Sequence, residues 1–211
     1  MDNTEKIKQE LVKTVGKGLY NGWNNRTSFG YHSYNIGEIN IVGQRNPKMR
    51  IEGMKKHLDF KDKNVLDFGC NVGAMLHHLE GIQNGAGFDY DERCIVAATS
   101  IASTLGKDNL KFNVHDFDKS GYQNLKDKIN FNPDIIFVLS LGSWVKTWKE
   151  LYQTCIQYNC DIVLETNNDE EGKPQLDYFR NSGMKITLMT DNSKDDSTGN
   201  NRRKTYLINK A

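Results

Sequence analysis

Short apolar runs alternate with longer amphipathic stretches from about Lys63 to the end of the chain. Parallel strands joined by crossover helices produce this pattern, so the chain is predicted to form an α/β sheet. The fourth run, DIIFVL, is the most apolar, as a central strand requires. The seven predicted strands are NVLDF (64–68), GAGFD (85–89), LKFNV (110–114), DIIFVL (134–139), DIVLE (161–165), MKITLM (184–189) and KTYLIN (204–209).

The segments between these runs predict the helices and the direction of the last strand. Residues 190–203 are too polar for a crossover helix, so the last two strands should pair antiparallel. The predicted fold is one doubly wound, mostly parallel seven-stranded sheet of the Rossmann-like kind, with an antiparallel last strand. Helices are expected at 72–79, 92–105, 122–129 and 145–158, and in a segment with Pro174 in its first turn that ends near Arg180.

The first 60 residues are expected to form an N-terminal cap on the same domain, and residues 61–211 the main domain. A chain of 211 residues suits one well-buried core better than two. Helices are predicted near residues 5–15 and after Pro47. The aromatic, Asn-rich segment 20–44 between them is long for a structureless loop, which favours a lid or a binding element.

Composition excludes several classes of protein. No apolar stretch reaches the roughly 20 residues that cross a bilayer, and the N-terminus MDNTEKIKQE is too charged for a secretory signal. We therefore expect a cytoplasmic protein without a membrane partner, with its four cysteines as free thiols. A formal net charge of +1 creates no global attraction for nucleic acid. The sequence leaves the oligomeric state open.

The segment DFGCNVG (67–73) lies where the first predicted strand becomes a helix, the place where an open α/β sheet binds its ligand. Its glycines, Gly69 and Gly73, allow the backbone to approach a bound molecule. Asp89 ends the second strand and is positioned to accept hydrogen bonds from two ribose hydroxyls. After the third strand, Asp116 and Phe117 offer an acceptor and an aromatic face to an adenine. Together the residues at these three strand ends predict a binding site for adenosine.

This combination resembles the class I methyltransferase family, and the resemblance extends from about Lys63 to the C-terminus. It implies S-adenosylmethionine as cofactor. An NAD site is the poorer alternative, because G-x-G-x-x-G would need glycine at Asn71. The resemblance places the methionine part beside Asp67, Gly69, Cys70, Asn71 and Gly73, the ribose beside Asp89, and the adenine beside Asp116 and Phe117, with Tyr90 and Leu139 completing the expected cofactor contacts.

A second, thinner likeness is to the RNA methylphosphate capping enzymes. Those enzymes have motifs similar to four segments of this chain. The segments are GQRNP (43–47), DFGCNVG (67–73), LSL (139–141) and WV (144–145). This resemblance implies that Arg45 and Tyr34 help to hold the cofactor. Lys146 replaces the histidine that follows W-V in that family, and ETNN replaces its fifth-strand sequence, so the likeness says little about the substrate.

The acceptor should bind where the carboxyl ends of the strands share one rim. His32 and Glu165 are the two candidate bases, and no acidic cluster has magnesium-site spacing, so no metal is expected. His77 and His78 point about 100° apart on a helix and cannot share an ion. The predicted acceptor contacts are Ser140, Trp144, Asn167, Asn168, Arg202 and Arg203.

These features favour O-methylation of a small polar or phosphorylated acceptor, such as a sugar or nucleotide derivative. An RNA 5′-phosphate or another RNA site is the second hypothesis, although the net charge of +1 gives it no support. A cofactor-binding partner protein without activity is the third hypothesis. The complete set of predicted cofactor loops argues against that third hypothesis.

Overall fold

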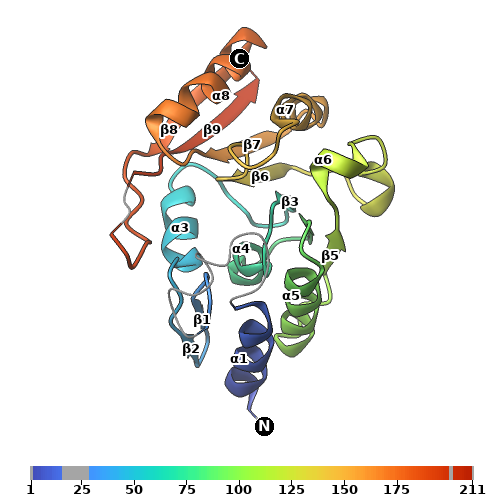
Figure 1. Cartoon of the computed structure of the whole chain (residues 1–211), viewed down its shortest axis with the longest axis vertical. Helices are drawn as coiled ribbons and strands as arrows, with labels where there is room; N and C mark the ends of the chain where they lie inside the picture. Colours follow the sequence, from blue (N-terminus) through green and yellow to red (C-terminus); the bar gives the residue numbers. More distant parts are fainter. Residues whose placement is uncertain (1, 16–28, 200–201, 211) are drawn as a thin grey trace.

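The computed structural model describes residues 2–15, 29–199 and 202–210. Its centre is a seven-stranded sheet in the order β5-β4-β3-β6-β7-β9-β8 (Figure 1). The neighbouring strands from β5 to β7 are parallel, whereas β9 runs antiparallel to both β7 and β8. This arrangement confirms the predicted Rossmann-like sheet with an antiparallel last strand. The strands are β3 (Asn64–Phe68), β4 (Asn84–Asp89), β5 (Leu110–Val114), β6 (Ile135–Leu139), β7 (Asp161–Glu165), β8 (Met184–Thr190) and β9 (Thr205–Lys210).

Helices cover both faces of this sheet, because its central strands are apolar on both sides. Leu66 and Phe68 of β3 pack in one cluster with α7 (Trp148–Gln157) and α8 (Asp169–Asn181). Val65, which points the other way, packs in a second cluster. That second cluster includes residues of α3 (Pro47–Met54), α4 (Ala74–His78) and α5 (Glu92–Thr104).

The N-terminal segment packs on the α4 and α5 side of the sheet. Ile7 and Leu11 of α1 (Asn3–Thr14) share a buried cluster with Ala97 and Ile101 of α5. A short hairpin of β1 (Tyr34–Ile36) and β2 (Ile39–Ile41) follows. It accounts for part of the predicted segment 20–44, of which residues 20–28 lie outside the described residues. Within the described ranges, no helix is both long and apolar enough to cross a membrane.

Two predicted helices were placed wrongly. In place of a helix at 122–129 there are a short α6 (Phe117–Ser120) and a 3₁₀ turn, η1 (Lys126–Lys128). Asp116 caps α6, and Gly121 ends it at φ 64°. Helix α8 begins five residues before Pro174, because Asn168 accepts a hydrogen bond from the Glu171 amide and caps the helix there.

Candidate functional site

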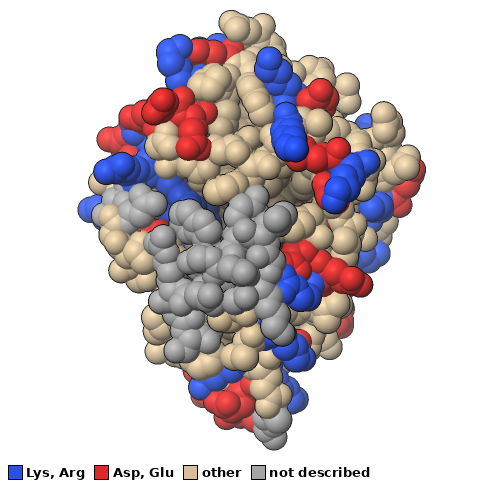
Figure 2. Space-filling view, in the orientation of Figure 1, with Lys and Arg blue, Asp and Glu red and all other residues tan. Residues whose placement is uncertain are grey.

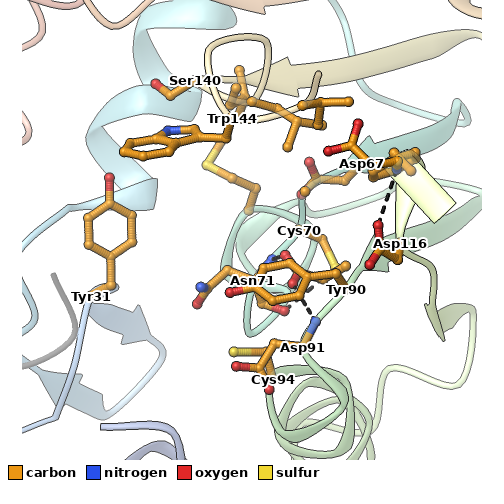
Figure 3. Close-up of a pocket in the computed structure, with 18 of the residues that line it drawn as sticks. Tyr31, Asp67, Cys70, Asn71, Tyr90, Asp91, Cys94, Asp116, Ser140 and Trp144 are labelled. Atoms are coloured by element: carbon orange, nitrogen blue, oxygen red, sulfur yellow. Dashed lines mark hydrogen bonds between the residues drawn. The ribbon is translucent and has the colours of Figure 1, made fainter. Parts of the chain in front are cut away.

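A cavity of about 600 Å³ opens at the carboxyl ends of β3, β4 and β6 and beside the loop after β5 (Figure 3). The sheet order reverses between β3 and β6, and such a switch point is where open α/β sheets bind ligands. The cavity brings together thirteen of the residues that sequence reasoning singled out: His32, Asp67, Gly69, Cys70, Asn71, Asp89, Tyr90, Asp116, Phe117, Leu139, Ser140, Trp144 and Arg203.

The turn after β3 brings its backbone to the cavity. The amides of Gly69 and Cys70 both donate to the Phe88 carbonyl, at 2.8 and 3.0 Å, which folds the turn against β4. Gly69 has φ 76°, and a Cβ there would lie 2.9 Å from the Leu141 side chain. Gly73, by contrast, does not line the cavity. A Cβ on Gly73 would meet the Phe112 ring at 2.5 Å, so this glycine is needed for packing.

Two buried carboxyl groups face the cavity, and burial raises the pKa of both. The Asp89 carboxylate accepts hydrogen bonds from the amides of Asn71 at 2.9 Å and Asp91 at 3.0 Å. Burial raises the pKa of Asp89 to about 6. Burial also raises the pKa of Asp67 to about 8, with Arg50 opposing the shift and Asp89 adding to it. Carboxyl groups held in this way favour a ligand that carries positive charge.

Asp116 and Phe117 line another part of the cavity. The hydrogen bond from Lys119, at 2.9 Å, holds the pKa of Asp116 below its usual range, so this carboxylate is an ionised acceptor. Phe117 is buried, with its ring edge-to-face to Phe68 and stacked on Tyr122. Such a fixed aromatic surface beside an acceptor suits a purine ring.

A buried arginine–carboxylate cluster lies next to the cavity and consists of Arg45, Arg50, Arg203, Glu165, Asp195 and Asp196. Arg45 is fully buried and pairs with Asp195 at 2.7 Å. Its other partners are Glu165 and Asp196, both at 3.4 Å. The cluster joins the N-terminal segment to β7 and to the β8–β9 loop, which descends beside α3 in Figure 1.

This cluster changes the expected role of Glu165. Burial alone would raise its pKa, but Arg50, Arg45 and Arg203 outweigh that effect and lower the pKa to about 2. Its carboxylate also accepts a hydrogen bond from Ser140 at 2.5 Å, and Glu165 does not line the cavity. In the structure Glu165 therefore forms ion pairs beside the cavity, and its role as a base stays a prediction.

Tyr34 and Arg45 also differ from the expectation, because neither lines the cavity. The Tyr34 hydroxyl donates to the Val72 carbonyl at 3.0 Å and lies 3.0 Å from Nδ1 of His77. It therefore supports the turn after β3 from behind. His78 is also tied to the hairpin, since its Nε2 accepts the Asn35 amide at 3.1 Å. Within the described part of the chain, no group of three or more His, Cys, Asp or Glu side chains could hold a metal ion.

His32 is the predicted base that remains in the cavity. It is 6% exposed, and its ring lies edge-to-face to Tyr31. Its Nδ1 is buried without a hydrogen-bond partner in the described structure. Burial, followed by the charges of Arg50 and Arg45, holds the pKa of His32 well below its ordinary value, so the imidazole is neutral near pH 7.

Asn167, Asn168 and Arg202 line a second hollow, of about 880 Å³, instead of the cavity itself. The two spaces share Trp144 and Arg203 as lining residues, so they adjoin there. Sequence reasoning missed Arg50, Asp91 and Lys146 as lining residues. Arg50 lies one helical turn after the cap of α3 and carried no motif that could have identified it.

Comparisons with known structures show which proteins share this fold. The N-terminal domain of EvdMO1 with SAH bound is 14% identical with a TM-score of 0.65, covering 100% of this chain and 98% of that domain. The chain spans 44% of the longer EvdMO1 structure. A putative methyltransferase in complex with the Haloferax volcanii Trm112 activator is 13% identical, at a TM-score of 0.57, over 78% of this chain and 90% of its own.

The methyltransferase domain of bacterial CtHen1-C is 11% identical with a TM-score of 0.59, over 78% of this chain and 96% of that domain. No protein-family model and no curated protein sequence matches the chain. The chain thus has the Rossmann-like fold of class I S-adenosylmethionine-dependent methyltransferases, and those enzymes are its structural neighbours.

Proposed function

We propose that this chain is an S-adenosylmethionine-dependent methyltransferase that methylates a hydroxyl oxygen of a small polar acceptor. The observation that carries the proposal is the convergence of three strand ends on one cavity. These are the Gly69–Asn71 backbone, the Asp89 carboxylate and the Asp116–Phe117 pair. SAH, the demethylated form of this cofactor, is bound in the EvdMO1 domain.

The lining residues fit the cofactor chemically. Asp89 would hold the ribose, Asp116 and Phe117 the adenine, and Asp67 with the turn after β3 the methionine part. Asp67 and Asp89 suit a ligand that carries an ammonium and a sulfonium group, because a nearby cation favours their ionised forms. When bound, S-adenosylmethionine supplies a methyl carbon activated by its sulfonium, and the electrons of the broken C–S bond stay with sulfur.

The charge balance at the other end of the cavity favours a neutral acceptor group. Tyr31, His32, Ser140, Trp144 and Arg203 line this end. The arginine–carboxylate cluster beside it contains three guanidinium groups and three carboxylates, so its formal charge is zero. A hydroxyl suits such surroundings better than a phosphate oxygen. The EvdMO1 domain was also crystallised in the presence of SAH and D-fucose, a hydroxyl-rich molecule.

A hydroxyl acceptor needs a proton acceptor, and we assign that role to His32. As the acceptor oxygen forms its bond to the methyl carbon, the hydroxyl proton passes to the neutral imidazole. The low pKa of His32 keeps it unprotonated before reaction. The His32 imidazole would have a higher proton affinity beside a neutral thioether than beside a sulfonium, so it would accept the proton more readily as the methyl group leaves.

His32→Ala is expected to lower kcat by about 10²- to 10⁴-fold while changing SAH affinity less than threefold, because general-base assistance is of that size. Calorimetry with SAH and a methyl-transfer assay measure the two effects. His57→Ala, on an exposed residue outside the cavity, is the matched control. An unchanged kcat for His32→Ala would remove the base assignment.

Cofactor binding is expected to release close to one proton at pH 7. The free Asp67 carboxyl, with a pKa of about 8, is mostly protonated there, and a bound ammonium would ionise it. Affinity should consequently rise by up to about tenfold per pH unit between about pH 6 and pH 7.5. Calorimetry in buffers of different ionisation enthalpy counts the protons. Asp67→Asn should abolish the release, and an equal release by that variant would contradict the assignment.

The direct test of activity uses the purified chain, S-adenosylmethionine with a labelled methyl group, and fractionated metabolites and short RNAs. Labelled product and matching SAH release in a small-metabolite fraction support the proposal. Label in RNA alone would replace the small acceptor with RNA. On the face shown in Figure 2, basic and acidic side chains of the described residues are interspersed in small groups, which favours the small acceptor. SAH binding without turnover on any fraction would indicate a cofactor-binding partner protein.

A further inference from the structure

The second hollow adjoins the end of the cavity that we assign to the acceptor. Trp144, Val145, Lys146 and Arg203 line both spaces. The indole of Trp144 lies in the same part of the cavity as Ser140 and Tyr31 (Figure 3). An acceptor whose hydroxyl lies near Tyr31 would therefore lie next to the hollow.

The hollow differs from the cavity in its charge. Three of its lining residues are cationic, namely Lys146, Arg202 and Arg203, and one, Glu171, is acidic. Arg203 is already paired with Glu165 at 3.4 Å. Lys146 and Arg202 are exposed and form no ion pair with any described residue. Two cations without an ion-pair partner among the described residues thus line the hollow, together with a single carboxylate.

The Glu171 carboxylate already accepts hydrogen bonds from neighbouring side chains. Glu171 accepts hydrogen bonds from the side-chain amides of Asn167 at 3.3 Å and Asn168 at 3.0 Å. A hydrogen bond with Ser143 is the main cause that holds its pKa below the usual range, followed by those amides. Glu171 is therefore ionised, but it forms no ion pair with Lys146 or Arg202. A ligand with two negative charges would balance both cations.

Aromatic surface completes the hollow. Trp144 is 47% exposed, and Trp148 also lines the hollow. The Trp148 ring is held edge-to-face against Tyr152 and Tyr178, so its position is fixed. One fixed indole and one exposed indole in a hollow with exposed cations suit the carbon skeleton of a sugar or the face of a nucleobase that carries a charged group.

We propose that the second hollow binds a phosphate or diphosphate group esterified to the acceptor, so that the substrate class is a phosphorylated sugar or a nucleotide-linked sugar. This inference rests on the proposed function, because the hydroxyl to be methylated lies in the adjoining cavity. The neutral end of the cavity holds the reacting hydroxyl, while Lys146 and Arg202 hold the anion. A free sugar would leave both cations without a partner.

The test is a fluorescence titration of the SAH-saturated full chain at low ionic strength, with Trp144 and Trp148 as reporters. The probes are pyrophosphate, glucose 1-phosphate, UDP-glucose and glucose. We expect all three phosphates to bind, and glucose 1-phosphate to bind at least tenfold more tightly than glucose. Tighter binding of UDP-glucose than of pyrophosphate would support a nucleotide-linked sugar, whereas equal binding would support the phosphate alone.

Two double variants test whether the phosphate binds in the second hollow. The double variant K146Q/R202Q should lose at least tenfold in affinity for pyrophosphate, because two charge-assisted contacts disappear. The matched control K56Q/R180Q removes two exposed charges outside the hollow and should bind normally. Equal affinity of the two double variants, or no binding of any phosphate, would overturn the inference. SAH binding, measured in the same samples, separates the phosphate site from the proposed function. A chain that binds SAH but no phosphate would refute only the phosphate site in the hollow.

Discussion

Asp89→Ala is expected to weaken SAH binding about 100-fold, the largest loss of any single cavity substitution. Its carboxylate ends β4 and would accept hydrogen bonds from two ribose hydroxyls, and two charge-assisted bonds contribute roughly 3 kcal/mol. The side chain also accepts the amides of Asn71 and Asp91, so its loss loosens the turn that borders the methionine part. Isothermal titration with SAH measures the effect.

Two further variants make this result specific. Asp89→Asn keeps the size of the side chain but removes its charge, and an intermediate affinity is expected. Asp108→Ala changes an exposed aspartate outside the cavity and should bind normally. Affinity within threefold of the original for Asp89→Ala would show that this carboxylate does not hold the ribose.

Arg45→Met is expected to lower the free energy of unfolding by about 3–5 kcal/mol, the largest stability effect among the described charged side chains. The substitution removes a fully buried cation and leaves Glu165, Asp195 and Asp196 with less compensation. Losing one partner of a buried ion cluster is costly, because the remaining charges stay buried. Urea unfolding at pH 7 measures the loss.

The effect of pH and a surface control identify the cause. Protonation relieves uncompensated carboxylates, so the loss should be smaller at pH 5 than at pH 8. Arg180→Met breaks a surface pair in which Asp177 is 39% exposed, and it should cost less than about 1 kcal/mol. A loss below 1 kcal/mol for Arg45→Met would mean that the cluster does not hold the N-terminal segment in place.

Sequence reasoning worked where one local pattern determines the structure. Each parallel strand is a short apolar run, and the motif at Asp67–Gly73 marks the turn after the first of them, so the sheet and its ligand edge could both be predicted. The helix predicted at 122–129 failed for the opposite reason. Asp116 caps the start of α6 and Gly121 ends this helix after one turn, although the segment that follows has helical composition.

The contacts between distant segments could not be predicted. Arg45 and Glu165 each suggested a ligand contact in isolation, yet they are buried partners separated by 120 residues. Tyr34 lies behind the cavity for a similar reason, because its hydroxyl meets the Val72 carbonyl. No spacing in one sequence shows that three arginines and three carboxylates converge, so the ion-pairing role of Glu165 required the structure.

The most direct measurement of the central claim is a pair of calorimetric titrations of the purified chain, one with SAH and one with NAD. The cavity formed by the turn after β3, Asp89 and the Asp116–Phe117 pair should bind SAH at a single site, and Asp89→Ala should weaken that binding. NAD should give no comparable heat. No binding of SAH, or tighter binding of NAD, would contradict the assignment of this cavity to a methyl-donor cofactor.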